Sequence, residues 1–147
     1  MKKWFWLMAS VLVFLACKKD QFEKDEALIK QYISDNKLDA SRTSEGLYYV
    51  ISDSGTGIKP TLANSVKINY SGYLTNGKVF DSSPEGNPPT FALTNLIVGW
   101  QIGLPLLKEG GRIKLLVPSA LGYGSKAVGT IPANSVLVFD IELLDVI

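Results

Sequence analysis

The sequence predicts an α+β fold, a sheet of about five antiparallel strands with one short helix against one face. Two observations lead to this prediction. Segments rich in β-branched and aromatic residues, several of them alternating apolar and polar side chains, recur between residues 47 and 146. Within that region only one short apolar stretch, residues 100–107, favours a helix. A domain of about a hundred residues buries roughly 60–70% of its unfolded surface, which is enough for a stable core.

The first segment has the pattern of a targeting signal. Met1-Lys2-Lys3 is a short basic start, and residues 4–16 are apolar apart from Ser10. This stretch is shorter than the roughly 20 residues of a membrane-spanning helix and suits a secretory signal. Cys17 follows directly, which resembles the bacterial lipoprotein signal, whose cysteine is lipidated and becomes the first mature residue. We therefore expect a membrane anchor at Cys17, with a signal-anchor and an incidental cysteine as the alternative.

The next segment combines a charged tether with a helix. Residues 18–25 are charged and short, which suits a tether. From about Gln21 to Asn36 the pattern is that of an amphipathic helix, because apolar residues recur at three- and four-residue spacing: Phe22, Leu28, Ile29, Tyr32 and Ile33. Such a helix packs on its own domain or on a second copy of the chain more often than on a membrane. A homodimer through this helix is therefore a further expectation.

The strand segments then follow one another. Residues 47–51 are β-branched and aromatic, and the glycines within residues 55–57 break the segment. Residues 66–71 alternate apolar and polar side chains, which predicts a half-buried strand. Asn76-Gly77 indicates a two-residue hairpin, because both residues tolerate positive φ. Three prolines and a glycine make residues 83–89 a loop.

The helix and the last two strands complete the predicted sheet. Residues 100–107 should form the short helix, and Pro105 should shorten or kink it unless it lies in the first turn. Residues 112–117 alternate in the manner of a strand, and residues 136–146 form the last strand. The glycine-rich segment 122–133 joins the two.

Composition excludes several classes of function. The chain has no histidine, which removes the commonest general base and the commonest metal ligand. Its single cysteine allows no intrachain disulfide, and its net charge of +1 gives no electrostatic basis for binding nucleic acid. We expect no cofactor, no metal and no nucleic-acid partner. Any catalysis should work through shape, desolvation, hydroxyls and carboxylates.

Aromatic residues at strand ends and loop edges are the candidates for a binding pocket. Tyr70 and Phe139 should lie on central strands and Trp100 at the start of the short helix, where core packing is the ordinary explanation. Tyr123 lies between two glycines, which let the backbone turn sharply and expose the ring. A pocket built from such rings can hold an apolar ring, exclude water and offer a few fixed hydrogen bonds.

Phe80-Asp81 adds a carboxylate to this set. Asp81 follows the aromatic Phe80 at the end of a hairpin strand, and we expect the Asp81 carboxylate to be buried. The alternative is a turn-forming aspartate that bonds its own backbone through Ser82 or Ser83.

Taken together, these segments resemble the FKBP-type peptidyl-prolyl isomerases. Residues 66–83 are similar to the first signature of that family, and residues 91–100, which end in Ile97-Val98-Gly99-Trp100, to the second. The remainder of the family pattern is matched by segments that resemble it in this chain: Gly110-Gly111-Arg112, Val117-Pro118, Leu121-Gly122-Tyr123-Gly124, Ile131-Pro132-Ala133-Asn134 and residues 137–144. The resemblance runs from about Leu47 to Ile147.

The resemblance implies a fold and an activity. The fold would be a five- to six-stranded antiparallel half-barrel around one short helix, preceded here by the amphipathic helix. The activity would be cis-trans isomerisation of X–Pro bonds in proline-containing polypeptides, assisting the folding of exported proteins. By position, the resemblance makes Asp81, Tyr123 and Trp100 the catalytic residues, with Trp100 as the floor under the pyrrolidine ring. It makes the substrate-binding residues Tyr70, Phe80, Leu96, Ile97, Ile131 and Phe139.

Two loops depart from the family pattern. The loop of residues 84–90 is shorter than in the small eukaryotic members and lacks their basic residue near Asp81, and residues 125–130 replace a longer apolar segment. These departures bear on inhibitor affinity and sequence preference more than on catalysis.

The chain therefore divides into three expected parts. Residues 1–16 are a lipoprotein signal peptide, residues 17–44 a lipidated tether with the amphipathic helix, and residues 45–147 the isomerase domain. We expect a membrane-anchored lipoprotein of the cell envelope that faces the periplasm or the surface. Two alternatives stay open: a non-catalytic binding module or chaperone for proline-containing segments, and a structural lipoprotein whose helix mediates assembly.

Overall fold

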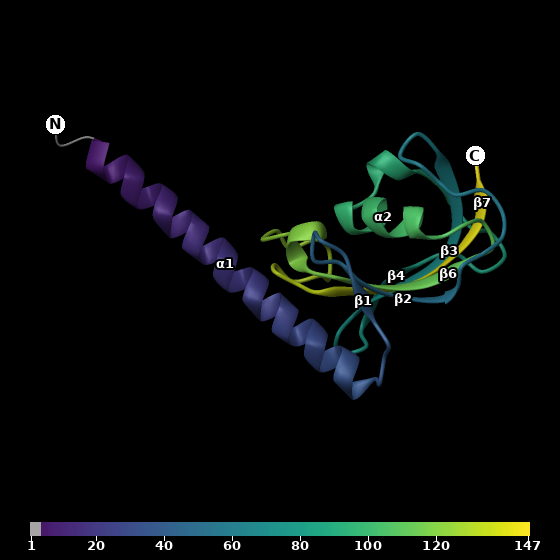
Figure 1. The fold of residues 1–147 in the computed structure, drawn as a ribbon, viewed down its shortest axis with the longest axis horizontal. Helices are drawn as coiled ribbons and strands as arrows, with labels where there is room; N and C mark the ends of the chain where they lie inside the picture. The colour runs from purple at the N-terminus through teal and green to yellow at the C-terminus, as the bar shows by residue number, and fades with distance from the viewer. Residues whose placement is uncertain (1–3) are drawn as a thin grey trace.

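The computed structural model describes residues 4–147, and for residues 4–15 it describes the backbone alone. The basic start of the predicted signal peptide and the side chains of its apolar stretch lie outside the described residues. In the described part of the chain, seven strands form one antiparallel sheet (Figure 1). They are β1 (Ser41–Arg42), β2 (Tyr48–Asp53), β3 (Ser65–Leu74), β4 (Val79–Ser82), β5 (Thr90–Ala92), β6 (Arg112–Val117) and β7 (Leu137–Val146).

The strands run in the order β1-β2-β6-β7-β3-β4, and β5 pairs with β3 beside β4. The α+β class with a curved antiparallel sheet around one short helix is confirmed. Five of the strands lie where the sequence predicted them. The two additional ones, β1 and β5, are two and three residues long, which is too short for an alternating pattern to appear.

The hairpin between β3 and β4 lies where Asn76-Gly77 placed it, but its turn differs from the expected one. The Leu74 N–H donates to the Lys78 carbonyl at 3.0 Å, and the Gly77 N–H donates to the Leu74 carbonyl at 2.8 Å. The loop therefore has three residues, 75–77, instead of two. Only Gly77 has a positive φ, at 87°, and Asn76 does not. A three-residue loop needs one left-handed position at its end, which the glycine supplies.

The short helix α2 (Val98–Gly103) begins two residues before the predicted start and continues as a 3₁₀ turn, η2 (Leu104–Leu106). Pro105 explains the change, because its nitrogen cannot donate the hydrogen bond that would continue the α-helix. The helix also lies close to the sheet. A Cβ added at Gly103 would lie 2.7 Å from Leu115 Cδ2, so glycine permits this approach. Two further 3₁₀ turns are η1 (Leu93–Asn95) and η3 (Ser119–Leu121).

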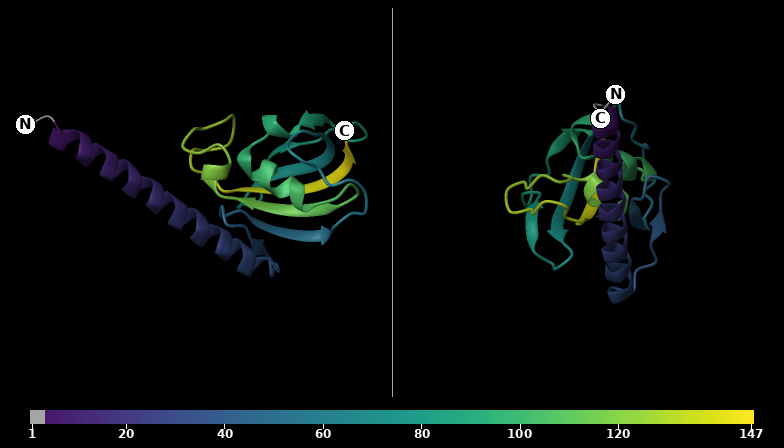
Figure 2. Two further views of the ribbon diagram at one scale, coloured as in Figure 1. Left: turned by 45° about the horizontal axis from the view of Figure 1, so that its top comes forward. Right: turned by 90° about the vertical axis from the view of Figure 1, so that its left-hand side faces the viewer.

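The long helix α1 (Trp4–Asp35) differs most from expectation. Its end at Asp35 matches the prediction, but residues 18–25, expected as a tether, are helical. They contain neither glycine nor proline, so nothing interrupts the helical hydrogen bonds upstream of the amphipathic part. At about 1.5 Å per residue, the helix is about 48 Å long. Its N-terminal half projects away from the sheet in Figure 1 and in the left-hand view of Figure 2.

The sheet carries a hydrophobic cluster on each face. The larger one lies between the sheet and α2 and includes Leu115 and Phe139. The smaller one lies on the opposite face, where Ile29 of α1 packs with Leu116 and Val138. Neighbouring residues on a strand point to opposite faces, which is why Leu115 and Leu116 belong to different clusters. The apolar stripe of α1 therefore packs on the domain itself, as one of the two expectations had it.

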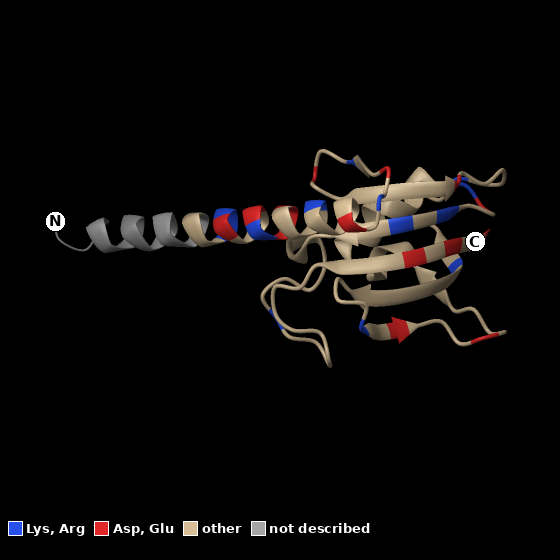
Figure 3. Cartoon of the chain, turned by 90° about the horizontal axis from the view of Figure 1, so that it is seen from below, with Lys and Arg blue, Asp and Glu red and all other residues tan. Residues whose placement is uncertain are grey.

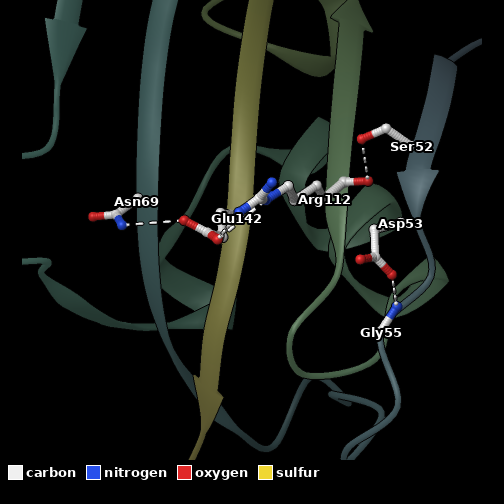
Figure 4. A network of polar contacts seen from close by, with 6 residues as sticks. All are labelled: Ser52, Asp53, Gly55, Asn69, Arg112 and Glu142. Atoms are coloured by element: carbon white, nitrogen blue, oxygen red, sulfur yellow. Dashed lines mark hydrogen bonds and ion pairs between the residues drawn. The ribbon is translucent and has the colours of Figure 1, made fainter.

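The described side chains of α1, from residue 16 onward, and the strands of the outer face of the sheet include charges of both signs (Figure 3). Across three strands of that face, Arg112 bonds Glu142 at 2.8 Å and Asn69 Nδ2 donates to Glu142 at 3.3 Å (Figure 4). The Arg112 bond is the main reason why the pKa of Glu142 lies below its ordinary value. Exposed pairs of this kind contribute about 0–1 kcal/mol, so the network keeps this face solvated more than it stabilises the fold. None of the described helices is both long enough and apolar enough to span a membrane.

Candidate functional site

One pocket lies between α2 and the concave face of the sheet, with a volume of about 420 Å³. This is within the roughly 300–1,000 Å³ of small-molecule and peptide side-chain sites. The structure brings all nine sequence-predicted site residues to its lining: Tyr70, Phe80, Asp81, Leu96, Ile97, Trp100, Tyr123, Ile131 and Phe139. They come from β3, β4, the two residues before α2, α2 itself, β7 and the loop before β7. Their functional roles stay predictions.

Trp100 forms the floor of the pocket. It lies on α2 with 4% of its surface exposed, and it also belongs to the larger core cluster. Its ring meets Tyr70 edge-to-face at 5.3 Å between centroids and Phe139 at 5.0 Å. The indole nitrogen is buried, and no described atom accepts a hydrogen bond from it. The base of the pocket is therefore an aromatic ring held by neighbouring rings, with one buried N–H donor that no described atom pairs.

The rings continue on both sides of Trp100. Phe139 meets Phe80 edge-to-face at 5.6 Å, and Tyr70 meets Phe91 at 6.4 Å, so five aromatic rings form one connected wall and floor. Gly72 leaves the space for two of them. A Cβ added there would lie 2.7 Å from Phe139 Cε1 and 2.8 Å from Phe80 Cε2. Edge-to-face pairs contribute about 0.5–1.5 kcal/mol each beyond their buried area, which favours a rigid arrangement.

The carboxylate of Asp81 lies at the edge of the pocket and is exposed, so the expectation of a buried acid is wrong. Being at the end of the edge strand β4, it has solvent on one side. The Tyr70 hydroxyl donates to Asp81 Oδ2 at 2.9 Å. Burial, followed by this hydrogen bond, raises the pKa of Tyr70 to about 12. The phenol is therefore neutral at physiological pH and directs its proton at Asp81.

The turn-forming alternative for Asp81 does not describe the local structure. It is Ser83 that bonds the backbone there, because the Tyr70 N–H donates to Ser83 Oγ at 3.1 Å and the Ser83 N–H donates to the Tyr70 carbonyl at 3.0 Å. These bonds fix the end of β4 against β3. They leave the Asp81 side chain to the Tyr70 hydroxyl.

Tyr123 lies at the rim with 39% of its side chain exposed, as its flanking glycines indicated. Gly124 has a φ of 63°, a left-handed conformation that glycine adopts without strain. On the same rim, Val128 and Ile131 exchange two backbone hydrogen bonds of 3.0 and 2.9 Å. This turn places Ile131, only 6% exposed, against the pocket.

Sequence reasoning missed five lining residues: Phe91, Asn95, Val128, Gly129 and Thr130. Phe91 is the most informative of them, because it extends the wall of rings. It lies in the three-residue strand β5, which pairs with the start of β3. Its signals were an aromatic residue two positions after the loop prolines and its place at the start of the segment similar to the second family signature. The loop residues carry no chemical signal in the sequence.

The arrangement fits an apolar ring better than a reacting carbonyl or phosphate. Its floor and walls are rings and aliphatic side chains, and its polar groups are at the rim. In the described part of the chain, the lining contains no cysteine, histidine or lysine that could act as a nucleophile or general base. What such a site can do is exclude water and fix a few hydrogen bonds.

Comparison with known proteins places this geometry in a family. Residues 56–144 match the family model described as FKBP-type peptidyl-prolyl cis-trans isomerase. The chain is 45% identical over 139 residues to the FKBP-type peptidyl-prolyl cis-trans isomerase FkpA of Buchnera aphidicola subsp. Schizaphis graminum, covering 87% of this chain and 54% of that protein. The chain thus spans about half the length of the curated relatives it matches.

Solved structures show the same similarity. The crystal structure of FkpA from Escherichia coli aligns with a TM-score of 0.75 at 38% identity, covering 95% of this chain and 71% of that one. The crystal structure of AtFKBP13 aligns with a TM-score of 0.68 at 35% identity, covering 74% of this chain and 98% of that one.

Proposed function

The chain belongs to the FKBP-type peptidyl-prolyl cis-trans isomerase family, and on this premise we propose that it catalyses cis-trans isomerisation of X–Pro bonds in exported polypeptides. The observation that carries the proposal is the convergence of nine predicted residues on one pocket floored by Trp100. Its volume of about 420 Å³ accommodates a proline ring with part of the residue before it.

The chemistry follows from the amide bond. Rotation about X–Pro passes through a twisted amide with a barrier of roughly 18–20 kcal/mol, so the uncatalysed exchange takes tens of seconds or longer. The planar amide separates charge between oxygen and nitrogen, and twisting removes much of that separation. Water stabilises the planar form, whereas a dry aromatic pocket favours the twisted one relative to it. No nucleophile, metal or proton transfer is needed.

Each of the nine predicted residues then has a role in this mechanism. Trp100 lies under the pyrrolidine ring, and the walls that exclude water come from Tyr70, Phe80, Leu96, Ile97, Ile131 and Phe139. Asp81 and the Tyr123 hydroxyl orient the peptide by hydrogen bonds of about 1–3 kcal/mol each. Asp81 is a hydrogen-bonding group and not a base, because the reaction removes no proton.

The test is an isomerase assay on a short X–Pro peptide, combined with refolding of a protein limited by proline isomerisation. Acceleration of both supports the proposal. Tight binding of the peptide without acceleration would instead favour a non-catalytic binding module or chaperone. The alternative keeps the same pocket, so binding alone does not separate the two functions.

We also propose a lipid anchor at Cys17, whose side chain is exposed on α1. The support is its position directly after the apolar stretch of the predicted signal. Processing before Cys17 would leave the half of α1 that reaches the sheet, attached to the membrane of the cell envelope. Incorporation of labelled fatty acid into the chain, absent from a Cys17→Ser variant, tests this proposal. Labelling that survives the substitution contradicts it.

We also propose a homodimer through α1. Of the five apolar stripe residues, Ile29 is fully buried against the sheet, Tyr32 and Ile33 pack against the same cluster, and Leu28 is 44% exposed. The stripe is therefore largely occupied within one chain. Sedimentation of the full chain in detergent, compared with a Leu28→Asp variant, tests the dimer. A monomer in both contradicts it.

A further inference from the structure

A buried carboxylate joins α1 to the pocket domain. Asp25 is 3% exposed, and its Oδ2 accepts hydrogen bonds from the Ser119 backbone N–H at 2.8 Å and from Ser119 Oγ at 2.5 Å. Its Oδ1 accepts from Gln21 Nε2 at 2.7 Å, one turn earlier on the helix. A buried carboxylate is costly unless it is hydrogen-bonded, and here both oxygens are. The contact lies at η3, which precedes the rim of the pocket.

Backbone hydrogen bonds connect Ser119 to the two residues that flank Tyr123. Its carbonyl accepts two backbone hydrogen bonds, from the Gly122 N–H at 3.0 Å and from the Gly124 N–H at 2.8 Å. These glycines are the two neighbours of Tyr123. The N–H and hydroxyl of Ser119 are therefore bonded to Asp25. The carbonyl of the same residue is bonded to the backbone on both sides of Tyr123.

We propose that Asp25 is a positioning residue for Tyr123, so that α1 sets the geometry of the pocket rim through Ser119. The inference rests on the proposed function, in which the Tyr123 hydroxyl orients the peptide. Without the carboxylate, two buried donors of Ser119 lose their acceptor and must move to reach water or another partner. Since Ser119 carries the hydrogen bonds of both flanking glycines, that movement transfers to the Tyr123 backbone.

Docking of α1 and positioning of Tyr123 are separable in this structure. Ile29, one turn after Asp25, is fully buried in the cluster with Leu116 and Val138 on the sheet. Truncating Ile29 therefore weakens docking and leaves the Ser119 bonds in place. Truncating Asp25 removes those bonds and leaves the apolar packing.

The experiment compares four variants of the full chain in detergent micelles. Asp25→Ala removes the acceptor, and Asp25→Asn keeps a neutral oxygen that can accept both Ser119 bonds while Gln21 turns its amide. Ile29→Ala is the docking control. Glu23→Ala, an exposed acid on the same helix, is the charge control. The readouts are kcat/KM on an X–Pro peptide, exchange rates of the Gly122 and Gly124 amides, and the NMR resonances of Tyr123 and of the Trp100 indole.

For Asp25→Ala we expect glycine amide exchange about tenfold faster and kcat/KM about fivefold lower, because the bonds that hold the rim are lost. The Tyr123 resonances should shift while the Trp100 indole resonance stays in place. Asp25→Asn should recover most of both losses, since it restores the acceptor without the charge. Ile29→Ala should lower the denaturation midpoint and leave exchange and kcat/KM within about twofold, and Glu23→Ala should change nothing.

Two results overturn the inference. One is wild-type exchange and wild-type Tyr123 resonances in Asp25→Ala, and the other is equal loosening of the rim in Ile29→Ala. If Asp25→Ala does not fold, Ser119→Ala, which lacks only the hydroxyl donor, decides the matter. Faster exchange of the Gly122 and Gly124 amides and shifted Tyr123 resonances are then expected, and wild-type values of both overturn the inference. If the wild type has no isomerase activity, the proposed function fails, whereas exchange and resonances still decide whether Asp25 holds the rim.

Discussion

Replacing the floor of the pocket should remove most of the catalysis without unfolding the domain. The substitution is Trp100→Leu, which keeps an apolar side chain on α2 and removes the ring that meets Tyr70 and Phe139. Two edge-to-face pairs are lost, at about 0.5–1.5 kcal/mol each, together with part of the ring's buried area. The total cost in the free energy of unfolding is about 2–4 kcal/mol. A domain stable by about 5–15 kcal/mol remains folded after such a loss.

The effect on activity follows from the contact with the proline ring. If leucine leaves about two methylenes of that ring uncovered, at about 0.8 kcal/mol each, the transition state loses about 1.5 kcal/mol. This corresponds to a roughly tenfold fall in kcat/KM. The assay is isomerisation of a short X–Pro peptide, with refolding of a proline-limited protein as the second substrate.

The control for this prediction must be destabilised equally without touching the pocket. Leu143 is fully buried in the same cluster and does not line the pocket, so Leu143→Ala, at about 2–5 kcal/mol, is suitable. Its kcat/KM should stay within about twofold of wild type. Two results would refute the reasoning: wild-type activity in folded Trp100→Leu, or an equal loss of activity in Leu143→Ala.

Three further predictions concern the walls and the edge of the pocket. Gly72→Ala adds a methyl group 2.7 Å from Phe139 Cε1, so it should cost about 1–3 kcal/mol in the free energy of unfolding and lower kcat/KM severalfold. An unchanged kcat/KM would show that catalysis does not depend on a fixed spacing of the rings. Asp81→Asn keeps an acceptor for the Tyr70 hydroxyl, so kcat/KM should fall by less than about fivefold, and a hundredfold loss would instead give the carboxylate a role in proton transfer. The pKa of Tyr70 is raised to about 12 in the folded chain, from an ordinary value of about 10 in the unfolded chain. The neutral phenol therefore contributes its full stability below about pH 10, and this contribution is lost as the pH rises through about 12. In urea unfolding, wild type should therefore lose its advantage over Tyr70→Phe between about pH 10 and about pH 12, and a constant difference across this range contradicts the shift.

The floor and most of the walls of the pocket could be predicted because their rings lie in regular elements. Tyr70, Phe80 and Phe139 lie on strands that the sequence predicted, and Trp100 lies on the one apolar helix within the domain. Once the strands are placed, the pleat determines which face each ring occupies. The resemblance to a known family then ordered these residues around one site.

Features that depend on the length of a short element or on contacts between distant residues could not be predicted from the sequence. β5, which carries Phe91, is too short for periodicity to appear, and Asn76-Gly77 is compatible with both a two- and a three-residue turn. The exposure of Asp81 follows from its place on an edge strand, which the sequence does not state. Asp25 reads as one of several charges on a helix, because its partner Ser119 lies 94 residues away.

The pocket floor and the pocket rim are held by different forces, and this difference has a measurable consequence. Trp100 and Phe139 belong to the core cluster, so a change that alters the floor also removes buried contacts that stabilise the domain. Tyr123 is exposed and is held by backbone hydrogen bonds that lead to Ser119, so a change there leaves the core packing intact. Across a set of variants, loss of kcat/KM should therefore correlate with loss of stability for floor residues and be independent of it for rim residues. A single correlation for all variants would mean that the activity of floor and rim variants alike depends on global stability. The position of the rim would then not be set separately by α1.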